Sequence, residues 1–264
     1  MLVPGDRVEA HILEDGGTLV DRVLPRDSAL ARRTVEGRSK TLAANADAIV
    51  TVTSLAHPPP RLLILDQLLA YAELEDVAAL VVFTKPDLDE GGIGHELTEL
   101  YSWVGYETLT INPKIGLGVE ALRAWLAGRR ALLSGVSGVG KSTIFRALGG
   151  QSAVGDLSRQ GLGRQTTTSA RLYRTSGGFL IDSPGVTDFG LGAVGRDELG
   201  AAFREMPALA AQCRFRDCTH LREPDCAVRA AVASGALPES RYASYCRILE
   251  GGDTMRPVPG KGAS

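Results

Sequence analysis

The pattern of apolar and polar positions changes near residue 44. Before it, short alternating runs such as "DRVEAHIL" and "GTLVDRVLP" are broken by Gly and Pro, which predicts small strands of an all-β module. After it, "DAIVTVTSL", "AALVVFTKPDL" and "GGFLIDSPG" are apolar runs typical of buried strands. Between them, "HPPPRLLILDQLLAYAELEDV" predicts a turn and an amphipathic helix, and "GVEALRAWLAGR" predicts a second helix. Strands that alternate with helices indicate a parallel sheet covered on both faces.

The C-terminal part of the chain has a helical pattern that follows "DFGLG" and is interrupted by a cluster of Cys and His. The segment "PESRYASYCRIL" predicts a helix that begins with Pro238, because the first turn of a helix tolerates proline. The last residues, "GGDTMRPVPGKGAS", predict a flexible tail.

Composition places this chain of 264 residues, with 44% hydrophobic and 23% charged residues, among ordinary soluble proteins. No apolar run approaches the roughly 18 to 20 residues that span a bilayer, and the N-terminus does not resemble a secretory signal. We therefore expect a cytoplasmic protein. A net charge of -2 excludes a protein that coats nucleic acid by overall charge. Two basic segments, residues 22–40 and 158–174, are either local nucleic-acid contacts or solvated faces.

The segment "GVSGVGKS" matches the phosphate-binding pattern G-x-x-x-x-G-K-[ST] and lies between an apolar strand and a helix. Its glycines let backbone N–H groups converge on phosphate oxygens, and the helix N-terminus adds positive potential. Lys141 is expected to reach the outer phosphates, and the Ser142 hydroxyl is expected to bind magnesium. The predicted phosphate-binding residues are Gly135, Val136, Ser137, Gly138, Val139, Gly140, Lys141, Ser142 and Thr143.

Two later segments fit the terminal phosphate and its magnesium ion. In "LIDSPG", Asp182 ends an apolar strand and can hold the magnesium shell through water, while Gly185 frees its N–H for the terminal phosphate. In "GRQTTT", Thr167 is expected to reach magnesium in the triphosphate state and to release it after hydrolysis. Both patterns also occur in ordinary turns and loops, so their position after the phosphate loop carries the prediction.

The segment "TKPD" predicts recognition of guanine through Thr84, Lys85, Pro86 and Asp87. Asp87 would accept hydrogen bonds from guanine N1–H and the exocyclic amine, while the Lys85 stem lies along the base. Adenine offers no matching donors, so a buried carboxylate would stay unpaired at a cost of about 1–3 kcal/mol, which selects GTP over ATP.

The segment "TKPD", which we call the base reader, precedes the phosphate loop in this chain. In an ordinary GTPase the corresponding segment follows that loop. If the chain of an ordinary GTPase were cut between its phosphate-binding half and its base-binding half, and its original termini were joined, its motifs would follow in the order seen here. The joining segment would run through "NPKIGLGVEALRAWLAGRR".

Together these segments resemble the RsgA (YjeQ) family of circularly permuted GTPases along nearly the whole chain. "PGDRVE", "VLPRDSALAR", "AANADAIVTV", "TKPDL", "GVSGVGKST", "GRQTTT" and "DSPGV" follow in the family's order, and "CRFRDCTHLREPDCAVRAAV" and "RYASYCRIL" resemble its zinc-binding end. The resemblance implies an N-terminal OB-fold, a permuted GTPase domain and a C-terminal zinc subdomain. It also implies GTP hydrolysis stimulated by the small ribosomal subunit during late maturation of that subunit.

Three of the four cysteines, Cys213, Cys218 and Cys226, lie close to His220 in the sequence. The lack of a secretory signal favours a metal site over disulfides. Three thiolates and one imidazole make a closed tetrahedral zinc site with no position for substrate, so we predict a structural ion. The spacing by itself is also compatible with ordinary buried cysteines, and the resemblance supports the metal site. Cys246 is predicted to be a core residue.

Three features differ from the family's usual pattern. Family members usually carry further residues before "GDRVE", so the OB-fold is predicted to be incomplete, with an open edge. Gln165 stands where the family usually has a His that has been proposed to act in hydrolysis. Since Gln can orient a water without acting as a base, an altered rate is expected. Asn112 and Pro113 stand where the family often has Ser-Ala in its second guanine-contacting loop, which predicts weaker guanine binding.

The sequence thus predicts an α/β protein with four parts. These are a partial OB-fold-like module at 1–43, a circularly permuted P-loop GTPase domain at 44–195, a helical zinc-binding subdomain at 196–250 and a flexible tail at 251–264. The predicted catalytic residues are Lys141, Ser142, Gln165, Thr167 and Asp182.

We predict a monomeric, Mg²⁺-dependent GTPase that uses GTP and GDP and holds one structural Zn²⁺. Its predicted partners are the small ribosomal subunit and its rRNA, and no membrane. Two alternatives stay open. Gln165 and the short N-terminus favour a GTP-dependent ribosome- or RNA-binding module with little hydrolysis. A P-loop ATPase or kinase would be indifferent to the base.

Overall fold

The structure is a computed structural model and describes residues 2–33, 39–149, 171–182, 191 and 194–251. Its centre is a six-stranded sheet with the strand order β7-β6-β5-β8-β10-β9, in which β9 alone runs antiparallel to its neighbour. The strands are β5 (Ala48–Ser54), β6 (Ala78–Thr84), β7 (Glu107–Ile111), β8 (Arg130–Ser134), β9 (Arg171–Arg174) and β10 (Phe179–Asp182). The predicted parallel α/β sheet is therefore confirmed.

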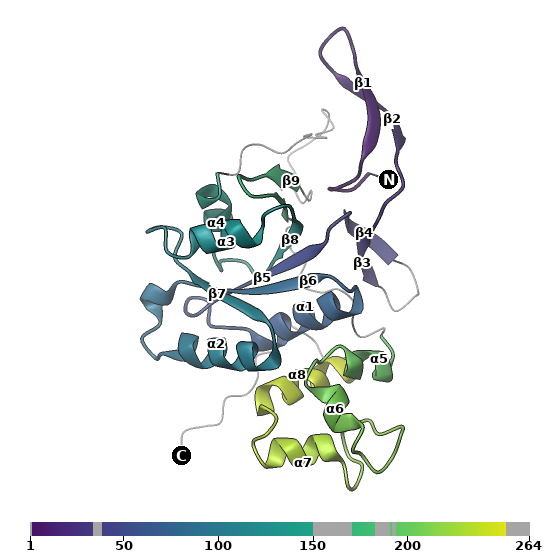
Figure 1. Cartoon of the computed structure of the whole chain (residues 1–264), viewed down its shortest axis with the longest axis vertical. Coiled ribbons are helices and arrows are strands. Elements are labelled where there is room, and N and C mark those ends of the chain that lie inside the picture. The colour runs from purple at the N-terminus through teal and green to yellow at the C-terminus, as the bar shows by residue number, and fades with distance from the viewer. Residues whose placement is uncertain (1, 34–38, 150–170, 183–190, 192–193, 252–264) are drawn as a thin grey trace.

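Helices cover both faces of this sheet (Figure 1). They are α1 (Leu62–Leu74), α2 (Ile93–Val104), α3 (Val119–Trp125), α4 (Lys141–Ala147), α5 (Arg196–Ala201), α6 (Met206–Ala210), α7 (Ala227–Ala233) and α8 (Glu239–Leu249). Helices α1 and α2 lie on one face and α3 and α4 on the other, while α5 to α8 form a separate layer beyond α1.

Successive residues of the central strands enter two different cores, because side chains alternate between the faces of a strand. Ile49 and Phe83 belong to the core beneath α1 and α2, whereas Val50 and Val82 belong to the core beneath α3 and α4. Burial on both faces explains why these strands are continuous apolar runs in the sequence.

Helix α1 differs from the prediction of an amphipathic helix. Every residue from 63 to 72 is buried, so the helix has no solvent-exposed face over that length. Its second side is covered because α8 packs against it, and Tyr71 also reaches the N-terminal strands. The nearly continuous apolar run of α1 itself indicates burial on all sides, but it does not identify α8 as the helix that covers the second side.

The N-terminal residues form two antiparallel hairpins, which confirms the predicted β-rich start. The first hairpin joins β1 (Val8–Ile12) to β2 (Thr18–Val23) and projects away from the central sheet (Figure 1). The second joins β3 (Ala29–Arg33) to β4 (Ser39–Ala44), and its Leu30 lies in the core beneath α1. The Tyr71 hydroxyl donates to the carbonyl of Ala31 at 2.9 Å, which ties β3 to α1.

Several elements were not predicted from the sequence, namely α2, β7 and the short strand β9. The helical C-terminal region is confirmed, and α8 begins at Glu239 with Pro238 immediately before it. The predicted tail at 251–264 lies almost wholly outside the described residues. The four-part division of the chain stays a prediction.

A buried charge cluster joins α8 to α1 and α2. Arg241 Nη1 lies 2.5 Å from Asp66 Oδ1, and its Nε lies 2.6 Å from Glu205 Oε1. The Tyr101 hydroxyl donates to the same Asp66 oxygen at 2.8 Å. Burial raises the pKa of Asp66, and the Arg241 charge opposes that rise. The guanidinium also lies 4.6 Å from the centre of the Phe203 ring, and these contacts together hold α8 against the rest of the protein.

We predict that Arg241→Met destabilises the protein by roughly 3–5 kcal/mol, because it leaves two buried carboxylates without their cation. The free energy of unfolding in urea measures this change. Arg214→Ala is the control, because it breaks an exposed ion pair with Asp225. Such pairs contribute about 0–1 kcal/mol. Equal losses in the two variants would contradict the prediction.

Candidate functional site

The carboxyl ends of the parallel strands bring the predicted nucleotide-site residues that the structure describes to one edge of the sheet. The chain leaves β5 toward β6 on one side, whereas β8 is followed by β10 on the other side. In an open α/β sheet, the point where connections diverge in this way is the usual position of a ligand crevice. Gly135 follows β8 there, Lys85 follows β6 and Asp182 ends β10.

The phosphate-loop segment turns sharply between β8 and α4. Gly135 has φ 149°, and a Cβ atom at this position would lie 2.1 Å from the carbonyl oxygen of Val52. Gly140 precedes α4 with φ 100°, a conformation that favours glycine. Glycine is therefore required at these two positions by close backbone approach and by the turn into the helix.

Lys141 folds over this loop. Its Nζ donates to the carbonyls of Gly135 at 2.6 Å and Val136 at 2.8 Å. Burial lowers the pKa of Lys141, and the charge of Asp182 opposes that change. Conversely, burial raises the pKa of Asp182, which Lys141 and Arg171 oppose. The ammonium and the carboxylate thus face a common region at the ends of β8 and β10, where a phosphate and a cation could both be held.

The base-reading segment is hydrogen-bonded to the phosphate loop. Thr84 Oγ1 donates to the carbonyl of Val139 at 2.6 Å, and Lys85 Nζ donates to the carbonyl of Gly138 at 2.7 Å and to that of His57. Lys85 has φ 59°, a left-handed conformation that is uncommon outside glycine. Two loops that are far apart in the sequence are therefore held at a constant separation.

Asp87 lies in the short turn η1 (Pro86–Leu88). The turn is at the surface and Asp87 is exposed, so the burial that the sequence argument assumed is not found. Its Oδ1 accepts a hydrogen bond from Asn112 Nδ2 at 2.9 Å. Sequence reasoning missed this contact, and it also assigned no role to His57, whose carbonyl holds Lys85. The resemblance to the family, which places Asn112 in the second guanine-contacting loop, was the signal that could have indicated this contact.

The remaining predicted site residues differ in position. Ser142 is exposed at the start of α4, and the N–H of Thr143 donates to the carbonyl of Gly140 at 3.0 Å. Ser137 is exposed within the phosphate loop. Gln165, Thr167 and Gly185 lie outside the described residues.

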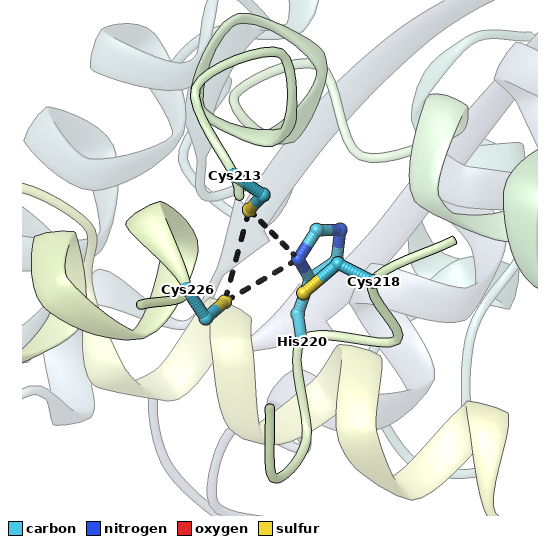
Figure 2. Close-up of side chains that lie close together, drawn as sticks. All are labelled: Cys213, Cys218, His220 and Cys226. Carbon is cyan, nitrogen blue, oxygen red and sulfur yellow. Dashed lines mark hydrogen bonds between the residues drawn. The ribbon is translucent and has the colours of Figure 1, made fainter. Parts of the chain in front are cut away.

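Four metal-ligand side chains converge between α6 and α7 (Figure 2). The ligand atoms of Cys213, Cys218, His220 and Cys226 all lie within 4.8 Å of one another. His220 Nδ1 lies 3.6 Å from Cys213 Sγ and 3.5 Å from Cys226 Sγ, and these two sulfurs are 3.9 Å apart.

These separations fit a tetrahedral zinc ion. Zn–S bonds of about 2.3 Å and Zn–N bonds of about 2.0–2.1 Å imply S–S edges of about 3.8 Å and S–N edges of about 3.6 Å. Burial lowers the pKa of His220, which favours the neutral imidazole that binds metals. Burial opposes ionisation of Cys213, yet hydrogen bonds from the backbone at Val228 and Ala227 hold the pKa of its thiol below the usual value. The predicted zinc ligands are thus brought together with suitable geometry.

Helix α8 supports this cluster from behind. The Tyr242 hydroxyl donates to the carbonyl of His220 at 2.6 Å, and the Tyr245 ring centre lies 6.2 Å from that of His220. Cys226 caps α7, since its Sγ accepts from the N–H of Arg229 at 3.5 Å. Cys246 is half-buried and packs against the hydrophobic core, as predicted.

The first basic segment consists partly of ion-paired residues on the β1–β2 hairpin and directly beside it. Arg22 pairs with Glu9, and Arg26 pairs with Asp6 at 2.6 Å. Most of the second basic segment, 158–174, lies outside the described residues. In the part of the chain that the structure describes, every helix is too short or too polar to cross a membrane.

The part of the chain that carries the nucleotide site matches a known protein family. The family model of the RsgA GTPase matches residues 23–192, which include the base reader, the phosphate loop and Asp182. The chain belongs to the RsgA GTPase family. It is therefore a GTP hydrolase, and the alternative of a P-loop ATPase or kinase is set aside.

Two RsgA relatives illustrate the extent of this similarity. The small ribosomal subunit biogenesis GTPase RsgA of Moorella thermoacetica is 38% identical over 253 residues, which cover 94% of this chain and 84% of the relative. The protein of the same name from Azotobacter vinelandii is 41% identical over 255 residues, which cover 94% of this chain and 74% of the relative.

Solved structures of RsgA-type proteins have the same fold. YjeQ from Thermotoga maritima matches with a TM-score of 0.73 and 32% identity, over 95% of this chain and 84% of that one. YloQ, a circularly permuted GTPase, matches with a TM-score of 0.69 and 25% identity, over 98% of this chain and 83% of that one. The predicted circular permutation is therefore confirmed.

We predict that Cys226→Ser lowers the zinc content of the purified protein from about one ion per chain to a small fraction of that, because a serine hydroxyl is a poor replacement for a thiolate. Thermal stability should fall with it, since Cys226 also caps α7. Elemental analysis and thermal unfolding measure the two effects. Cys246→Ser is the matched control and should keep its zinc. Undiminished zinc in Cys226→Ser would contradict the assignment.

Proposed function

We propose that this chain is a Mg²⁺-dependent GTPase that binds the small ribosomal subunit and acts in its late maturation, with turnover stimulated by the subunit. Relatives named small ribosomal subunit biogenesis GTPase RsgA support the ribosomal part of this proposal. The proposed partners are the subunit and its rRNA, and the proposed state is a cytoplasmic monomer. The proposed organisation is the predicted one, with a zinc subdomain after a permuted GTPase domain.

The observation that carries the nucleotide part is the pair of hydrogen bonds between the base-reading and phosphate loops. Thr84 and Lys85 each donate to a phosphate-loop carbonyl. One nucleotide can contact both the base-reading loop and the phosphate loop only when the distance between these loops matches the length of the nucleotide. Because these loops are joined directly, that separation is built into the protein before binding.

Each loop has a proposed role in the reaction. The backbone N–H groups of residues 135–143 and the Lys141 ammonium would hold the phosphates. The Ser142 hydroxyl and the Asp182 carboxylate would hold Mg²⁺, directly and through water, and the ion would neutralise charge that develops on the phosphates. We further propose that Thr167 and Gly185 contact the terminal phosphate and its ion, and that Gln165 orients the attacking water. Asp87 would read the guanine base.

Purified small ribosomal subunits should raise GTP turnover roughly tenfold or more, whereas large subunits should not, because contact with the small subunit would stabilise the arrangement of site residues that favours hydrolysis. Steady-state phosphate release measures this effect, and Lys141→Ala is the inactive control. Removal of Mg²⁺ should abolish turnover of the unaltered protein both with and without small subunits. Turnover that is indifferent to small subunits would exclude the ribosomal part of the proposal.

Replacing Gln165 by Ala should lower the single-turnover rate of GTP hydrolysis by roughly tenfold to a hundredfold without changing GTP affinity, because the attacking water loses its orienting group. Gln165→His should restore or exceed the rate. If Gln165→Ala hydrolyses GTP at the unaltered rate, the residue has no role in the reaction. If the wild-type chain does not hydrolyse GTP and only Gln165→His does, the chain acts as a GTP-dependent binding module.

A further inference from the structure

An arginine at the start of α1 borders the phosphate loop. Arg61 lines a cavity together with Gly135 and Val136, the first two residues of that loop. The other lining residues come from β5 and α1, and all of them are uncharged, namely Val52, Thr53, Ile64, Leu65 and Leu68. Among the described residues that line this cavity, Arg61 is therefore the one that carries a charge.

The Arg61 side chain is available to a ligand. The residue is exposed and occupies the N-cap position of α1, but its side chain makes no capping hydrogen bond. In the part of the chain that the structure describes, its guanidinium takes part in no hydrogen bond or ion pair, and its carbonyl accepts from the N–H groups of Ile64 and Leu65. A guanidinium has five N–H donors in a planar arrangement that fits the oxygens of a phosphate.

Arg61 has a fixed position because the elements on both sides of it are held in place. Every residue from 63 to 72 of the following helix is buried, and Asp66 in that helix is bound by α8. The preceding loop lies against the phosphate loop, since a Cβ atom on Gly138 would be 3.6 Å from Pro58 Cδ. The backbone that carries the guanidinium is thus placed beside the phosphate loop before a nucleotide binds.

The two parts of the phosphate loop have different neighbours. The base-reading loop donates hydrogen bonds to the carbonyls of residues 138–139, in the later part. The Lys141 ammonium instead donates to the carbonyls of residues 135–136, in the first part. A nucleotide whose base lies beside the later part therefore extends its outer phosphates toward the first part. Arg61 borders this first part, so the phosphate farthest from the base is the group nearest to it.

We propose that Arg61 is a further substrate-contacting residue, whose guanidinium donates to the terminal phosphate of GTP and thereby favours GTP over GDP. This inference rests on the proposed phosphate site. The contact is a charge-assisted hydrogen bond, in which Arg61 forms no covalent bond and transfers no proton. The mostly apolar walls of the cavity exclude water from one side of the contact, which strengthens the attraction between the opposite charges. GDP lacks the terminal phosphate and gains nothing from Arg61.

Isothermal titration calorimetry of the full chain with Mg²⁺ tests this contact. The two ligands are GDP and guanosine 5′-(β,γ-imido)triphosphate, a GTP analogue that resists hydrolysis. Arg61→Ala should weaken binding of the triphosphate analogue roughly tenfold to a hundredfold and leave GDP binding unchanged, because only the triphosphate loses a hydrogen bond between charged groups. The ratio of the two dissociation constants is insensitive to a fraction of unfolded protein, since both nucleotides bind the same folded molecules.

Two further variants sharpen the test. Arg61→Lys should keep part of the preference for the triphosphate, since it retains the charge but not the planar set of donors. Arg174→Ala is the matched control, because Arg174 is an exposed arginine that pairs with Phe179 at the end of β10 opposite to Asp182. It should leave both dissociation constants unchanged.

Two failures are distinguishable. If Lys141→Ala leaves the binding of both nucleotides unaltered, the proposed phosphate site is wrong. If Lys141→Ala weakens nucleotide binding while Arg61→Ala changes both dissociation constants equally or changes neither, the phosphate site stands and the contact of Arg61 with the terminal phosphate is refuted.

Discussion

The parallel pairing of β5 with β8 is the constraint on which the candidate site depends. Ala48 pairs with Ala131 and Thr51 with Ser134, although these strands are separated by three helices and two further strands along the chain. This register brings the ends of β6 and β8 to one edge and the Val52 carbonyl against Gly135. A slip of one residue would exchange the two faces of β5 and separate the phosphate loop from its neighbours. The contacts of Thr84 and Lys85 follow from this pairing.

Helix α1 connects that edge to the C-terminal helices. Near its start, Arg61 and Ile64 line a small cavity together with Gly135 and Val136 of the phosphate loop. In its middle, Asp66 is bound by Arg241 of α8. The same helix α8 supports the zinc ligands through Tyr242. A single buried helix therefore contacts both the nucleotide edge and the layer that holds the metal, which explains why it has no exposed face.

Local patterns were sufficient for several parts of the molecule. Strands β5, β6 and β8 were predicted because burial on both faces requires continuous apolar runs, and a Gly-rich segment between a strand and a helix identified the phosphate loop. The zinc ligands were predicted because four soft ligands lie within one short segment, so a few turns can bring them together. Helix α2 was missed although its buried residues Leu97, Tyr101 and Val104 recur at helical spacing. Strand β7 was missed because it is an edge strand with mostly half-buried residues, so its sequence is not a continuous apolar run. The complete burial of α1 was missed although its nearly continuous apolar run indicates burial on all sides, whereas α8, which covers it, lies too far along the chain to be identified from that run.

The sequence by itself determined the chemistry of the motifs and their order, and hence the family and the permuted topology, because each motif is a short run whose residues act together locally. Tertiary structure alone decided which groups support those motifs. Asp87 and Asn112 are 25 residues apart and meet only because β6 and β7 are neighbours in register. Arg241 meets Asp66 across 175 residues because two layers of helices pack together. Spacing in the sequence carries no information about such contacts, since they depend on sheet register and on the packing of layers.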